Sequence, residues 1–112
     1  MRKIKLIESI PNKVFCDWLF KIEPTGLVIK SDELHIHVKV DNPTFLYERG
    51  LVCAFNKSIS AEIQFSIEDF DYIYYEDGMI WFEDNTSEVA FFEGKISFDT
   101  IIEKLKTYGY ID

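Results

Sequence analysis

The stretch DYIYYEDGMIWFEDNTSEVAFFEG (residues 71–94) decides the fold that we predict for this chain, because it holds a hairpin signal between two runs of alternating residues. Asp77-Gly78 lies inside it, and Asp-Gly is a dipeptide that tolerates the positive φ angles of a two-residue type I′ turn. With these residues as the turn, Glu76 pairs with Met79. We therefore predict two antiparallel strands joined at Asp77-Gly78.

A four-residue loop at 84–87 extends this hairpin to a third strand, and the register then assigns every residue to a face. One face is apolar, as a core requires, and it carries Ile73, Tyr75, Ile80, Phe82, Val89 and Phe91. The opposite face and its turns combine aromatic rings with carboxylates, and we predict partner-binding residues there: Tyr72, Tyr74, Glu76, Asp77, Trp81, Glu83, Asp84, Glu88 and Phe92. Helices could cover either face, and the sequence leaves this choice open.

The net charge of −8 is concentrated in one region of the chain. Residues 58–94 contain ten acids and no Lys or Arg, whereas residues 1–57 contain nine bases and seven acids. Such an acidic region repels phosphate, so it opposes binding to nucleic acid or to an anionic membrane. It favours a basic protein partner.

The rest of the chain predicts an α+β fold with a helix near each end. Apolar residues at helical spacing occur in PNKVFCDWLFKI (11–22) and in SFDTIIEKLKTYGY (97–110), where Ile101, Ile102, Leu105 and Tyr108 share a face. Ser9 or Asn12 could cap the first helix. Between the helices, apolar residues alternate with a period of two. We predict a mostly antiparallel sheet of five to seven strands, with TFLYERGLVCAF (44–55) as one strand or two.

A length of 112 residues predicts a single domain, 1–112. The N-terminal residues lack the apolar run of a signal peptide, and no stretch approaches the roughly 20 apolar residues that cross a bilayer. We therefore expect a cytoplasmic protein with no membrane partner, and its oligomeric state, monomer or dimer, is left open. Cys16 and Cys53 lack metal-site spacing and are expected to be buried thiols.

Catalytic and metal chemistry lack a signature in this sequence. His35 and His37 could lie on one strand face, but a metal site needs further ligands, and no cluster of that size is visible. No nucleophile motif or phosphate-binding glycine loop occurs, so we predict no enzyme activity, no metal site and no cofactor.

In size, acidity and lack of a catalytic signature, the chain resembles bacterial immunity proteins, including those of contact-dependent growth inhibition. The segment YIYYEDGMIWFED (72–84) carries the resemblance at the level of residues. The resemblance implies a non-enzymatic inhibitor that occludes the active surface of a basic, nuclease-like toxin. It transfers no functional residue.

Two alternatives remain open from the sequence. Residues 65–110 look like the second half of a pleckstrin or GRAM domain, in which strands are followed by a helix that plugs the sheet, although this half lacks the basic cluster that phosphoinositides need. The chain could instead be a phage or accessory subunit that associates with itself through the aromatic face.

Overall fold

The computed structural model describes residues 3–31, 36–56, 58, 61–92, 94–95 and 97–112. These residues form two helices and nine strands, so the predicted α+β class is confirmed. The strands are β1 (Ile4–Lys5), β2 (Gly26–Ser31), β3 (Ile36–Asp41), β4 (Thr44–Glu48), β5 (Leu51–Asn56), β6 (Ala61–Phe65), β7 (Tyr72–Glu76), β8 (Met79–Glu83) and β9 (Ser87–Phe92). The helices are α1 (Asn12–Ile22) and α2 (Phe98–Thr107).

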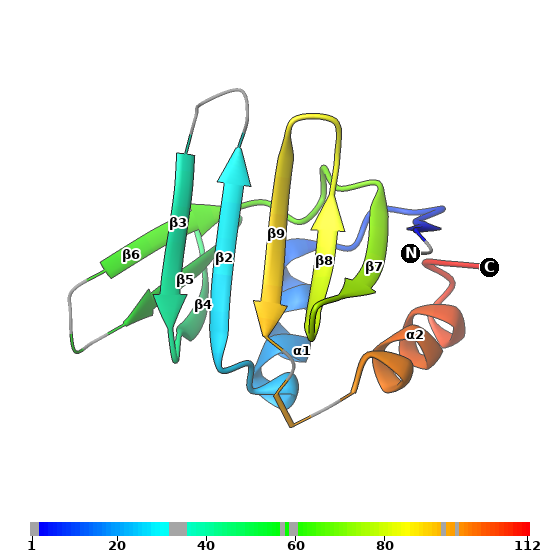
Figure 1. Ribbon diagram of the computed structural model, residues 1–112. Coiled ribbons are helices and arrows are strands. Elements are labelled where there is room, and N and C mark those ends of the chain that lie inside the picture. Colours follow the sequence, from blue (N-terminus) through cyan, green and yellow to red (C-terminus); the bar gives the residue numbers. More distant parts are fainter. Residues whose placement is uncertain (1–2, 32–35, 57, 59–60, 93, 96) are drawn as a thin grey trace.

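The strands form two antiparallel sheets. The larger sheet has six strands in the order β1-β7-β8-β9-β2-β3, and the smaller sheet has the order β4-β5-β6 (Figure 1). The predicted register is confirmed, because Glu76 pairs with Met79 in the first hairpin and Glu83 pairs with Glu88 in the second. Both turn residues have positive φ, 55° at Asp77 and 75° at Gly78, as a type I′ turn requires.

A second turn of this kind separates β4 from β5. Arg49 and Gly50 have φ angles of 54° and 81°. The stretch 44–55 is therefore two strands, which was one of the two expectations for it. Its hairpin belongs to the smaller sheet, so the chain folds into two sheets where the sequence predicted one.

The sequence allowed Asn12 as the N-cap of α1, but the structure gives its side chain another role. It is the first residue of the helix, and its buried side chain joins two distant loops: Oδ1 accepts from the Ile67 backbone N–H at 2.7 Å, and Nδ2 donates to the Gly50 carbonyl at 2.8 Å. A buried amide needs such partners, because an unpaired polar group costs free energy when it is removed from water.

The second helix begins and ends as predicted. The Ser97 side chain accepts from the Thr100 backbone N–H at 3.3 Å, and Gly109 follows the helix with a φ of 82°. Ile101 and Leu105 are buried, but Tyr108 was wrongly placed on the apolar face, since 63% of it is exposed. Its ring stacks on Trp18 at 5.9 Å instead.

The main core lies between the two sheets and α1. Phe91 is at its centre, with its ring centroid 5.5 Å from that of Phe15 on α1, 6.0 Å from Phe45 on β4 and 6.3 Å from Phe82 on β8. Apart from Tyr75, which is 41% exposed, the apolar face predicted for β7–β9 is thus the one that other elements cover, and we call it the inner face.

Cys16 and Cys53 are free and buried, as expected. Burial raises the pKa of the Cys16 thiol to about 11, because the thiolate would lose its hydration. Within the described parts of the chain, neither helix has the length and apolar character that crossing a membrane would take.

Candidate protein-binding face

The outer face of the six-stranded sheet is the surface opposite the core. Figure 1 views the sheet from this side, with α1 behind the strands and α2 beside the β7 edge. The small apolar cluster on this face, Tyr74, Trp81 and Ala90 with Met79 against it, takes all its members from β7, β8 and β9. Within the described residues, neither helix nor the smaller sheet contributes to this cluster.

Tyr74 and Trp81 form the centre of the outer face. They are cross-strand partners, and their rings stack in parallel with centroids 5.9 Å apart and an interplanar angle of 3°. The Trp81 indole N–H donates to the Glu76 carbonyl at 3.1 Å. Only 4% of Tyr74 and 7% of Trp81 remain exposed. The two rings are therefore parallel to each other and largely covered by neighbouring atoms.

Glu83 is a buried carboxylate on this face and is 8% exposed. One of its oxygens accepts a hydrogen bond from the Tyr74 hydroxyl at 3.0 Å, and the other forms an ion pair with the Lys3 ammonium. Burial raises the pKa of Tyr74 above its ordinary range, and the bond to Glu83 raises it further. The bond to Glu83 likewise raises the pKa of Lys3.

Lysines from the first 39 residues of the chain cover the rings of the outer face. The ammonium of Lys3 lies 5.4 Å from the centroid of Tyr74, and that of Lys30 lies 5.5 Å from the centroid of Trp81. Lys39 lies 5.4 Å from the centroid of Phe92. These are cation–π distances. The acidic segment, which contains no base, therefore receives its cations from β2, β3 and the residues before β1.

The strand register explains why these lysines gather here. Lys30 on β2 pairs with Glu88 on β9, which pairs with Glu83 on β8. Residues paired across an antiparallel sheet share a face. Sequence reasoning missed Lys3 and Lys30, because the residues of β1 and β2 lack the alternation by which the other strands were predicted.

Gly26 and the ring of Phe92 are in close contact on the outer face. It lies at the start of β2, and a Cβ atom at this position would come within 2.5 Å of the Phe92 ring. The ring of Phe92 thus lies directly on the backbone of its neighbouring strand, which only a glycine permits. This contact fixes the position of Phe92 between Gly26 and the ammonium of Lys39.

The predicted contact residues fall into two groups. Tyr74, Trp81 and Glu83 are buried within the outer layer, so their expected exposure was wrong. The others are partly or fully exposed: Tyr72, Glu76, Asp77, Asp84, Glu88 and Phe92. Asp77 lies in the β7–β8 turn and Asp84 in the β8–β9 loop, at opposite ends of the sheet. The structure brings the predicted strand residues to one face, but the three buried ones are occupied by contacts within the chain itself.

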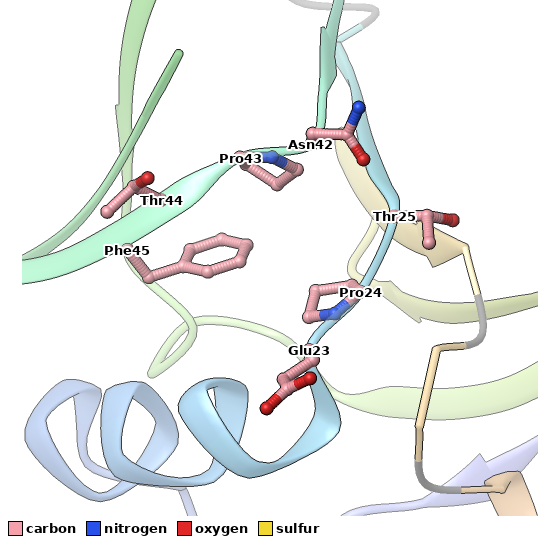
Figure 2. Close-up of a pocket in the computed structure, with 7 residues that line it drawn as sticks. All are labelled: Glu23, Pro24, Thr25, Asn42, Pro43, Thr44 and Phe45. Carbon is pink, nitrogen blue, oxygen red and sulfur yellow. The ribbon is translucent and has the colours of Figure 1, made fainter. Parts of the chain in front are cut away.

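A shallow pocket lies on another part of the molecule, where α1 and β3 lead into β2 and β4 (Figure 2). Pro24, Pro43 and Phe45 face one another across it, while Glu23 turns toward α1 (Figure 2). Glu23 and Asn42 both have positive φ before a proline, 46° and 45°. Glu23 pairs with Lys95 at 3.6 Å, so its charge already has a partner.

The prediction of no metal site concerned His35 and His37. His35 and the side chain of His37 lie outside the described residues, so that prediction stays untested. Elsewhere in the described chain, no group of three or more His, Cys, Asp and Glu side chains is placed to hold a metal ion.

Comparisons with known proteins found no match. No protein-family model matches this chain, and neither a curated protein nor a solved structure matches it. The role of the outer face therefore has to be argued from its own chemistry.

Proposed function

We propose that this chain is a non-enzymatic, cytoplasmic binding protein that uses the outer face of its larger sheet to bind a basic protein partner. The observation that carries the proposal is an open sheet face whose carboxylates and rings are paired with the chain's own lysines. Tyr74, Trp81 and Glu83 already bind Lys3 and Lys30. The same chemistry would accept the lysines and arginines of a partner.

Binding would proceed by exchange of cations. Lys3 and Lys30 are held on the surface by cation–π contacts and one ion pair, and contacts of this kind are weak where they are exposed. Arginine side chains of a partner could take their places over Tyr74 and Trp81, while exposed Glu76 and partly exposed Glu88 meet further positive charge. A net charge of −8 would speed the encounter with such a partner.

The class of partner that fits this surface best is a nuclease-like toxin. Proteins that act on nucleic acid carry positive charge around their sites, so an acidic antagonist can occlude those sites. We propose that this protein is an immunity protein of that kind. Self-association through the same face is the competing outcome.

The experiment is a capture with matched variants. The protein would be used as bait in a lysate of its host at low and at high salt, together with Glu88→Lys on the outer face and Glu103→Lys on the exposed side of α2. Both variants change the charge by the same amount.

We expect wild type and Glu103→Lys to retain one basic protein, and Glu88→Lys to lose most of it. The captured protein would then be assayed for nuclease activity with and without the bait. Equal retention by all three baits, or a dimer of the bait alone on a sizing column, would contradict the proposal.

A further inference from the structure

A second site lies on the other side of the larger sheet. A cleft of about 360 Å³ opens between the two sheets, at the end where the β8–β9 loop lies. Its walls come from β2, β3 and β9 of the larger sheet, from β6 of the smaller sheet and from the segment between β6 and β7. This volume is within the range of small-molecule sites.

The walls of the cleft are apolar but incompletely covered. Ile29 and Val38 are paired on the inner face of β2 and β3, and Ile63 and Phe65 line the cleft from β6. All four side chains are partly exposed, although they lie between two sheets. Phe70 and Val89, which also line the cleft, are buried. The sheets thus diverge here and leave apolar surface that the described chain does not fill.

The polar part of the cleft is negative. Asp69, Asp84 and Glu88 line it, together with serines and Gln64, and no Lys or Arg is among the described lining residues. None of the three carboxylates belongs to an ion pair found in the described chain. Lys30 is the cross-strand neighbour of Glu88, but its ammonium lies over Trp81 on the outer face.

One of these carboxylates has a fixed orientation. Asp84 Oδ1 accepts from the backbone N–H groups of Thr86 and Ser87, both at 2.8 Å. These bonds hold the carboxylate in the loop beside the cleft. Its other oxygen has no hydrogen bond among those found in the described chain.

We propose that this cleft binds a small organic cation with an apolar body, such as an aliphatic or aromatic amine. The apolar body would lie between Ile29 and Val38 on one side and Ile63 and Phe65 on the other. The ammonium group would lie near Asp69 and Asp84. Glu88 borders both this cleft and the outer face. The proposal for the cleft rests on Asp69, Asp84 and the apolar walls, so it does not depend on the proposed partner.

The probes are three compounds of similar shape: 2-phenylethylamine, 2-phenylethanol and 3-phenylpropionate. Their binding would be followed by backbone amide shifts in NMR spectra, which give both affinity and location. We expect the amine to bind about tenfold more tightly than the alcohol at low salt, because opposite charge in a partly enclosed site adds to the apolar contact. The carboxylate should bind more weakly than the alcohol.

Two matched variants locate the charge effect. Asp69→Asn should weaken binding of the amine about fivefold and leave the alcohol unchanged, whereas Glu103→Gln on α2 should change neither. Val38→Phe narrows the cleft and should weaken the amine and the alcohol together.

Equal affinities for the amine and the alcohol would overturn the proposal. So would shifts that map to the outer face around Trp81, or equal losses in Asp69→Asn and Glu103→Gln. Each of these results would leave the outer-face capture experiment unaffected.

Discussion

The inner and outer faces of β7–β9 are both aromatic, but they are closed in different ways. On the inner face, Phe82 and Phe91 meet Phe15 of α1 at steep angles, 84° and 56°. On the outer face, Tyr74 and Trp81 are parallel, and the atoms above them belong to lysine side chains. A ring can therefore be buried without a second layer of backbone, provided that long polar side chains lie across it.

The difference has an energetic consequence. Inner-face rings pack against α1 and the smaller sheet, whose backbones are fixed. Removal of one of these rings therefore leaves a cavity that the surroundings cannot fill. Outer-face rings are held by flexible side chains that can rearrange or admit water. We therefore expect substitutions on the two faces to differ in cost although the residues are similarly buried.

The largest expected effect is at Phe91. Phe91→Ala removes a ring that contacts four other phenylalanines and should lower the free energy of unfolding by about 3–5 kcal/mol. Urea denaturation followed by far-UV circular dichroism measures this loss. A smaller loss than that of Trp81→Ala would break the comparison between the faces.

Trp81→Ala should cost less, about 2 kcal/mol, because the lysines above the ring can settle onto the sheet. The variant should keep its far-UV spectrum and lose the near-UV signal of the Tyr74–Trp81 stack. Trp81→Phe is the control, since it retains a ring in the stack and should lose less than half as much stability. An unfolded Trp81→Ala protein would show that the outer layer is as rigid as the core.

Tyr74→Phe tests the polar part of the outer layer. It keeps the stacked ring but removes the hydroxyl that donates to Glu83, which should lower the free energy of unfolding by about 1–2 kcal/mol. Tyr72→Phe is the matched control on the same strand, and we expect it to be close to neutral. Equal effects of the two changes would mean that the Glu83 bond adds nothing.

The raised pKa of Tyr74 predicts a dependence on alkaline pH. The folded protein keeps this proton above the pH at which the unfolded chain releases it, so the stability that the bond provides is present below about pH 10 and is lost as the pH rises further. Denaturation of wild type and Tyr74→Phe between pH 8 and 11 should therefore converge at the alkaline end. A constant difference across this range would contradict the assignment.

The smallest expected effect is at Lys30. Lys30→Met removes the ammonium above Trp81 but keeps a chain that covers the ring, and it should cost about 0.5 kcal/mol or less. The Trp81 fluorescence should change more clearly than the stability. A loss above that of Tyr74→Phe would show that the cation holds the outer layer together.

Local signals in the sequence predicted the fold well where strands that follow each other in the chain also pair with each other. Asp77-Gly78 fixed the register of β7 with β8, and the 84–87 loop fixed that of β8 with β9. Strand β2 was missed because Leu27, Val28 and Ile29 form a continuous apolar run without alternation, and β1 is only two residues long. A continuous apolar run fits a buried strand or a buried helix equally well, so only its pairing with neighbouring strands identifies it as a strand.

The sequence predicted the rings and carboxylates of the candidate site, but not the lysines that lie among them. The rings and carboxylates are local to 72–92, so their common face followed from the hairpin register. Lys3 precedes β1, while Lys30 and Lys39 lie on β2 and β3, and this part of the chain reaches the acidic strands only through the long-range pairings of β1 with β7 and of β2 with β9. The prediction of an acidic rim around exposed rings was therefore incomplete, since the sheet places Lys3, Lys30 and Lys39 among the acids.

The ion pair between Lys3 and Glu83 also constrains how the chain folds as it is made. The two residues lie 80 positions apart, and Lys3 leaves the ribosome first. At roughly 5–20 residues per second, Glu83 follows about 4–16 s later. During that interval β1 has no β7 to pair with, and the basic residues Lys3 and Lys5 stay open to other contacts. The outer face is therefore completed only after its acidic strands, β7 to β9, have emerged.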